Sequence, residues 1–123
     1  MGTVVVATRE PGNAFRYYAI LQSIGHQVFA ADNPAQVFTC MLGKQASLLI
    51  VEDGFIEASS AHGFIKKVRS IPGPESLIPI IRICSGPVSV SPESSYNHAV
   101  ETIRSPATAS SLEAAIRRLN DIS

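Results

Sequence analysis

The sequence predicts an α/β domain built on a parallel sheet. Short apolar runs rich in β-branched residues alternate five times with segments whose apolar residues recur at helical spacing. Runs that are apolar at consecutive positions are typical of parallel strands, because helices cover both faces of such a sheet. With 123 residues, 46% hydrophobic and 16% charged, the chain has the size of one domain, and we expect a single core over residues 1–123.

The first strand is predicted from Thr3 to Thr8, ahead of Pro11-Gly12. A helix should follow from Asn13 to Gly25, because apolar residues recur there at helical spacing and glycine is suited to close a helix. The second strand is predicted at Gln27–Ala31. The apolar stripe expected on the first helix is Phe15, Tyr18, Ile20, Leu21 and Ile24.

Asp32-Asn33-Pro34 predicts the start of a second helix, since it offers a capping side chain and a proline suited to the first turn. This helix should end near Gly43, and a buried strand should follow at Ser47–Val51. A third helix is expected to end at Pro72-Gly73-Pro74, ahead of a fourth strand at Ile78–Cys84. The apolar positions are Val37, Phe38, Met41 and Leu42 in the second helix and Phe64, Ile65, Val68 and Ile71 in the third, where Lys66, Lys67 and Arg69 should face water.

The stretch from Ser85 to Asn97 opposes a long helix, because it holds glycine, two prolines and five serines. At most a short helix is expected within Glu93–Ala99. The fifth strand is predicted at Val100–Arg104. Thr108 can cap the last helix, whose shared apolar face is Leu112, Ala115, Ile116 and Leu119.

Composition excludes several classes of function. Ten basic and ten acidic residues cancel, which disfavours binding to DNA or to an anionic membrane. No apolar run reaches the roughly 18 residues of a membrane span, and no targeting segment is evident, so we expect a soluble, cytoplasmic protein. Glycine-rich phosphate loops do not occur, and His26, His62 and His98 share no metal spacing. Cys40 and Cys84 are expected to be buried free thiols.

In parallel α/β sheets the functional site lies beyond the carboxyl ends of the strands. The polar residues at these ends are Thr8, Arg9, Glu10, Glu52, Asp53, Cys84, Ser85 and Ser105. Four segments hold most of them: Val-Ala-Thr-Arg-Glu-Pro at 6–11, Leu-Leu-Ile-Val-Glu-Asp at 48–53, Pro-Ile-Ile-Arg-Ile-Cys-Ser at 79–85 and Thr-Ile-Arg-Ser-Pro-Ala at 102–107.

In this order the four segments resemble the receiver domain of two-component response regulators, and the likeness covers nearly the whole chain. The resemblance implies a flavodoxin-like sheet in the order 2-1-3-4-5 with helices on both faces, the fourth of five helices being short or irregular here. It also implies a Mg²⁺-holding acidic pair, a phosphoacceptor aspartate, a switch hydroxyl and a lysine.

This chain departs severely from that pattern. The acidic pair falls on Thr8 and Arg9, with Glu10 beside them, and the switch hydroxyl falls on Cys84 unless Ser85 replaces it. The lysine position is Ser105. The apolar run places Glu52 at the acceptor position, whereas the spacing to the third helix favours Asp53, and both alternatives stay open. The resemblance therefore implies a degenerate, or pseudo-receiver, domain.

Two arginines, Arg9 and Arg82, stand at positions that suggest a role. Arg9 stands where the charge of the metal would be needed, so we expect it to pair with Glu52 or Asp53 as an internal cation. A longer carboxylate at position 52 would also imitate a phosphorylated aspartate. Arg82 interrupts an apolar strand and is expected either to reach past the sheet, covering an edge, or to contact a partner.

The favoured function is a non-enzymatic module of bacterial two-component signalling that acts by protein–protein interaction, without a cofactor. Its expected partners are a histidine kinase or an output domain, or a second copy bound through the face of the fourth strand, fifth strand and last helix. The first alternative is a phosphoacceptor that uses Asp53 and Mg²⁺. The second is a sensor of a small anion or nucleotide with Arg9 and Arg104 near its site.

Overall fold

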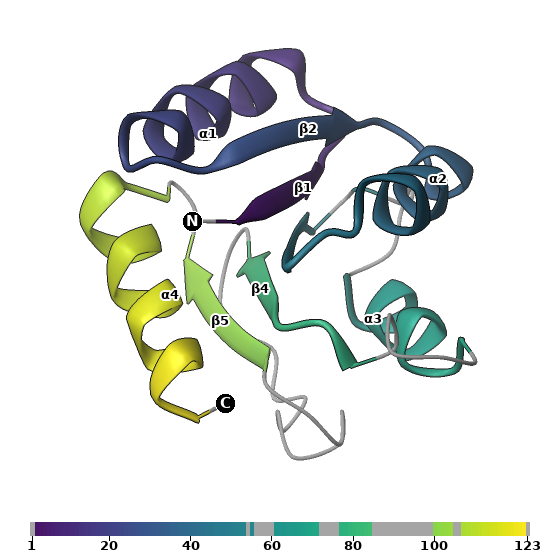
Figure 1. Ribbon diagram of the computed structural model, residues 1–123. Helices are drawn as coiled ribbons and strands as arrows, with labels where there is room; N and C mark the ends of the chain where they lie inside the picture. The colour runs from purple at the N-terminus through teal and green to yellow at the C-terminus, as the bar shows by residue number, and fades with distance from the viewer. Residues whose placement is uncertain are drawn as a thin grey trace.

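The computed structural model describes residues 2–53, 55, 61–71, 77–84, 100–104 and 107–122. Five parallel strands form one sheet in the order β2-β1-β3-β4-β5 (Figure 1). This confirms the predicted fold class and strand order. The strands are β1 Thr3–Ala7, β2 Gln27–Ala31, β3 Leu48–Glu52, β4 Ile80–Cys84 and β5 Val100–Arg104.

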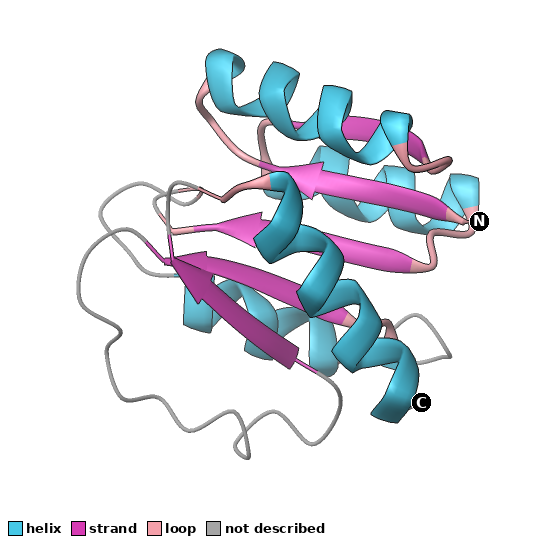
Figure 2. Cartoon of the chain, turned by 90° about the vertical axis from the view of Figure 1, so that its left-hand side faces the viewer, coloured by secondary structure: helices cyan, strands magenta, loops and turns pink. Residues whose placement is uncertain are grey.

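Helices cover both faces of the sheet (Figure 2). The four helices in the described part of the chain are α1 Pro11–Ser23, α2 Pro34–Lys44, α3 Ala61–Arg69 and α4 Ala109–Ile122. Side chains of α1 and α4 share one buried cluster with Val4, Val6 and Ile50, whereas those of α2 and α3 share another with Val5 and Leu49. Successive residues of one strand thus pack into the core clusters on opposite faces of the sheet. This explains why the strands are apolar at consecutive positions.

The helix ends follow from local chemistry. Asn33 caps α2, since its Oδ1 accepts the Gln36 N–H at 2.9 Å, and Pro34 occupies the first turn. Gly25 has a φ of 98° after α1, a conformation that glycine adopts without strain. Gln45 ends α2 in the left-handed region with a φ of 52°, so the helix runs to Lys44 and stops one residue beyond the predicted Gly43.

The predicted apolar stripe of α1 is confirmed at Leu21, Ile20 and Ile24, which pack in or against the core, but it is wrong at Phe15 and Tyr18. Phe15 is 75% exposed and Tyr18 is 39% exposed, whereas Tyr17 and Leu21 are buried. The helix begins at Pro11 and turns Asn13 and Tyr17 inward, toward the end of β3, where both side chains form hydrogen bonds. A buried polar group needs such partners, and this requirement sets the phase of the helix.

Two smaller expectations are also corrected. Leu42 is 56% exposed rather than part of the apolar stripe of α2. Arg69 does not simply face water: it is half-buried and its Nη1 donates to the Ile78 carbonyl at 2.7 Å, while burial lowers the pKa of its guanidinium. The predictions for Ser85–Asn97 and for Pro72-Gly73-Pro74 lie outside the described residues. Within the described ranges, no helix is both long and apolar enough to cross a membrane.

Candidate functional site

The centre of the candidate site is the carboxylate of Glu52, the last residue of β3. The residue is only 6% exposed. Oε1 accepts hydrogen bonds from Thr8 Oγ1 at 2.7 Å and Asn13 Nδ2 at 3.2 Å. Oε2 accepts from Asn13 Nδ2 at 3.0 Å and Tyr17 Oη at 2.8 Å. Both oxygens are therefore held by protein donors.

Two elements position these donors. Thr8 directly follows β1, whose last residue Ala7 pairs with Val51, so the hydroxyl lies beside the end of β3. Asn13 and Tyr17 stand four residues apart on α1, which places them on one side of the helix. Thr8 Oγ1 also accepts the Glu10 N–H at 3.1 Å, which fixes the turn between β1 and α1. The cluster thereby ties α1 to the ends of β1 and β3.

The donors to Glu52 are neutral side chains. Hydrogen bonds to the ionised form are what make the burial of a carboxylate tolerable. The effect is reciprocal at Tyr17, where burial raises the pKa of the phenol well above its ordinary value and the neighbouring Glu52 raises it further. Tyr17 is consequently a permanent donor at neutral pH.

Asp53 points toward the other side of the sheet, because successive residues alternate in direction. Its carboxylate pairs with Arg82, with Oδ1 at 3.2 Å from Nε and Oδ2 at 3.4 Å from Nη2. The Arg82 side chain is 2% exposed and that of Asp53 is 15% exposed. Arg82 therefore neither extends past the sheet to solvent nor offers itself to a partner, contrary to both sequence interpretations. It is an internal cation of β4.

Cys84, predicted at the switch-hydroxyl position, is 1% exposed at the end of β4. Burial raises the pKa of its thiol, and the nearby Asp53 charge adds to the effect. The raised pKa favours the protonated thiol. Ser85 and Ser105, the alternative hydroxyl and the lysine position, lie outside the described residues.

The three residues after β1 differ in burial. Thr8 is buried in the Glu52 cluster, whereas Arg9 and Glu10 are exposed. The cation that the structure shows on Asp53 is Arg82, and the donors that it shows on Glu52 are uncharged. Arg82 on β4 is therefore an internal cation of the site, and the pairing expected for Arg9 stays a prediction.

The residues present do not fit a Mg²⁺ site. Glu52 and Asp53 leave β3 on opposite sides, and each is engaged by protein donors. No cluster of three or more His, Cys, Asp or Glu residues capable of holding a metal is found in the ranges that the structure describes. A hard divalent cation prefers several oxygen ligands converging on one point.

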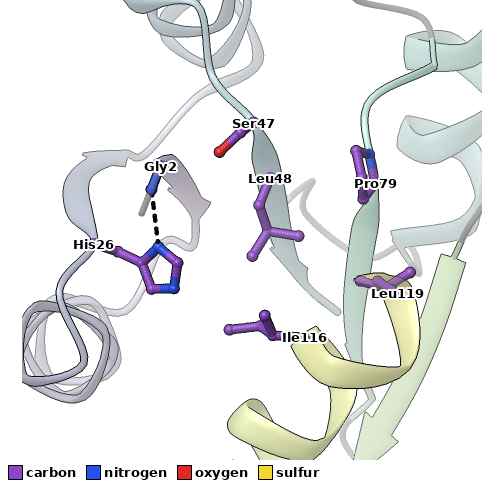
Figure 3. A pocket seen from close by; sticks show the side chains of 7 residues that line it. All are labelled: Gly2, His26, Ser47, Leu48, Pro79, Ile116 and Leu119. Carbon is purple, nitrogen blue, oxygen red and sulfur yellow. Dashed lines mark hydrogen bonds between the residues drawn. The ribbon is translucent and has the colours of Figure 1, made fainter. Parts of the chain in front are cut away.

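The pocket in Figure 3 lies at the opposite end of the sheet. It has a volume of about 230 Å³ and is lined by residues that include His26, Ser47 and Pro79, which precede β2, β3 and β4, and Ile116 of α4. The Gly2 N–H donates to His26 Nδ1 at 3.4 Å across its edge. None of the residues of the Glu52 cluster lines this pocket.

Asn13 and Tyr17 were not anticipated from the sequence. Their signal is the spacing Asn13, Tyr17 and Leu21, which puts two donors in line with an apolar anchor on one helix face. A buried glutamate ending an apolar strand calls for such donors.

The fold is that of response-regulator receiver domains, a class of regulatory domain in two-component signalling. A response regulator receiver domain of Clostridium thermocellum matches with a TM-score of 0.80 and 17% identity over 98% of this chain and 96% of that chain. A CheY-like receiver domain of Methylobacillus flagellatus matches with a TM-score of 0.80 and 12% identity, over 97% and 98%. A chemotaxis protein of Vibrio cholerae matches with a TM-score of 0.80 and 15% identity, over 97% and 98%. No family model and no curated protein matches the sequence.

Proposed function

We propose that the chain is a pseudo-receiver, a regulatory module of two-component signalling that acts by protein–protein interaction without phosphorylation of an aspartate. The observation that carries the proposal is the closed set of hydrogen bonds around Glu52, which occupies the end of β3 beside Thr8. Phosphoryl transfer to a carboxylate needs a free oxygen and a metal that neutralises the developing charge. Neither requirement is met by the contacts around Glu52.

The same contacts support a permanently engaged state. Glu52 is one methylene longer than aspartate and carries its negative charge to Thr8, Asn13 and Tyr17. In this proposal the carboxylate takes the place of an acquired phosphoryl group, and α1 stays fixed to the sheet. Signalling then depends on the availability of partners rather than on a covalent switch.

The partner surface in this proposal is the face formed by β4, β5 and α4, which binds a histidine kinase, an output domain or a second copy. Glu101 on β5 and Arg118 on α4 form an ion pair of 3.1 Å there, with the Arg118 side chain 51% exposed. The pair presents charge to a partner. Neither DNA nor a membrane is a partner in this account, and the domain works in the cytoplasm.

The main rival is a phosphoacceptor that uses Asp53 with Mg²⁺. The ion pair with Arg82 speaks against it, because it already neutralises Asp53 and directs the carboxylate away from Thr8. The other rival is a sensor of a small anion or nucleotide at Arg9 and Arg104. Both are exposed, as they would have to be for such a role.

A thermal-shift titration with Mg²⁺ tests the proposal. A ligand that binds only the folded state raises the melting temperature, so a receiver-type metal site gives a clear rise at about 10 mM Mg²⁺. We expect no rise for the natural chain. A variant with Thr8→Asp and Arg9→Asp, which restores two carboxylates beside Glu52, is the matched control and should gain stability from Mg²⁺.

A rise in the natural chain that disappears in Asp53→Asn would contradict the proposal and favour the phosphoacceptor. A rise with inorganic phosphate or ADP that disappears in Arg9→Ala would instead favour the sensor.

A further inference from the structure

The outer edge of β2 differs from the other edge of the sheet. β2 is the edge strand beside β1, and its five residues, Gln27–Ala31, include no charge and no proline. The opposite edge strand, β5, carries Glu101 and Arg104. Edge strands of soluble proteins are usually protected by charged side chains or proline, since an unprotected edge pairs with other strands. β2 lacks this protection.

The hydrogen bonds to β1 show which backbone groups of β2 point outward. The Gln27 N–H donates to the Gly2 carbonyl at 3.0 Å, and the Ala31 carbonyl accepts the Thr8 N–H at 3.1 Å. Because backbone groups alternate in direction along a strand, the odd-numbered residues face β1. The N–H and C=O groups of Val28 and Ala30 therefore point away from the sheet.

The edge is accessible at its carboxyl-terminal half. Ala30 is exposed and lines a hollow of about 260 Å³ together with residues of α1 and α2 and with the charged residues Arg9 and Asp32, which follow β1 and β2. Helices α1 and α2 therefore leave the end of the strand open on its outer side.

The neighbouring surface of α1 is also uncharged. Arg16 is the one charged residue of the helix, and it donates to the Ala107 carbonyl ahead of α4. Tyr18 lies on the opposite flank, toward the β2 edge, by the 100° step of the helix, and Phe15 is 75% exposed on the outer face. A strand edge and an exposed aromatic surface thus lie side by side.

We propose that two copies of this chain associate through β2, forming a continuous ten-stranded sheet across a two-fold axis at Phe29. In this antiparallel register Val28 lies opposite Ala30 of the second copy, and the two residues exchange both hydrogen bonds. Ala30 and Val28 of the second copy form the symmetric pair. The N–H and C=O groups of Val28 and Ala30 are therefore all hydrogen-bonded in each copy.

The outer edge of β2 is complementary to itself, which is why a second copy of the chain is the proposed partner. The register sets Gln27 opposite Ala31 and His26 opposite Asp32, so no like charges face each other. The net charge of zero adds no general repulsion between copies. A stable interface buries at least about 1,000 Å², more than a five-residue ladder alone, so Tyr18 on the β2 flank of α1 belongs to the proposed interface in both copies. The face of β4, β5 and α4 stays free for another partner.

Sedimentation velocity over a concentration series tests this proposal. The natural chain should show a monomer–dimer equilibrium, and Ala30→Lys, which adds a charge at the exposed edge position, should weaken it at least tenfold. Ala35→Lys places the same change on the exposed surface of α2 and should leave the equilibrium unchanged. Hydrogen exchange should show amides of Val28 and Ala30 that become protected as the protein concentration rises.

A natural chain that remains monomeric at about 1 mM, a concentration at which even a weak specific dimer forms, overturns the proposal. A dimer that resists Ala30→Lys but is lost in Arg118→Glu also overturns it and assigns association to the β4, β5 and α4 face. If Ala30→Lys fails to fold, Tyr18→Glu serves as the second variant, and the exchange of the Val28 and Ala30 amides in the natural chain decides independently.

Discussion

The buried ion pair between Arg82 and Asp53 should be the most sensitive electrostatic contact in the domain. Replacing Asp53 by Ala leaves the Arg82 guanidinium, 2% exposed, without the carboxylate that it contacts at 3.2 Å. Breaking a buried pair by removing one partner costs about 3 to 5 kcal/mol. Because Asp53 retains 15% exposure, we expect the lower end, about 3 kcal/mol. For a chain of this length that is a fall in melting temperature of about 10 °C.

The matched variant is Arg82→Met, which replaces the cation by an apolar chain of similar length within β4. It should cost less than Asp53→Ala, because Asp53 is the more exposed partner. The double variant should be more stable than the sum of the two single losses predicts, since the two residues interact with each other and their losses are not independent. Urea unfolding of all four proteins measures the coupling. Additive losses, or an Asp53→Ala variant as stable as the natural chain, would refute this description of the pair.

Three further substitutions test the contacts around the site and the helix ends. Tyr17→Phe removes the 2.8 Å hydrogen bond to Glu52 and should cost about 1 to 2 kcal/mol at pH 7. The unfolded phenol ionises near its ordinary pKa of 10.0, whereas the folded pKa is raised, so the natural chain should lose stability above pH 10 and its advantage over Tyr17→Phe should shrink. Urea unfolding curves of both proteins between about pH 7 and about pH 11, on either side of this pKa, check both statements. A stability difference that grows with pH would contradict them. Asn33→Ala removes the cap of α2 and should lower the free energy of unfolding by about 1 kcal/mol in urea. Gln45→Gly relieves the left-handed backbone and should raise the melting temperature, with a gain of about 0.5 to 1 kcal/mol, whereas a loss would show that the Gln45 side chain stabilises the turn.

The strands were predictable because doubly buried parallel strands leave a strong sequence signal, and their order was predictable from the resemblance to receiver domains. Runs such as Leu48–Glu52 are apolar at consecutive positions and end at polar residues, and the structure places those ends at one edge of the sheet. Apolar spacing found Leu21 on the buried face of α1 but did not separate Tyr17 from Phe15 and Tyr18. That choice depends on the donors that Glu52 requires across a separation of 35 residues.

The sequence predicted that a cation lies at the site but did not predict which residue pairs with Asp53. The sequence indicated Arg9 as a cation that stands in for the metal, and it did not indicate that Arg82 would be a second one. The choice is made by the register of β3 and β4, which sets Val51 beside Arg82 and brings the guanidinium to the Asp53 side of the sheet. Sequence reasoning carries no information on that register before the strands are paired.

The most direct test of the central claim is the intact mass of the protein after incubation with a small phosphodonor and Mg²⁺, beside Glu52→Ala and Asp53→Ala. The account predicts no gain in mass for the natural chain, because both oxygens of Glu52 are held by neutral donors and Asp53 is paired with Arg82. The gain of one phosphoryl group that disappears in Asp53→Ala would contradict it and make Asp53 a working acceptor.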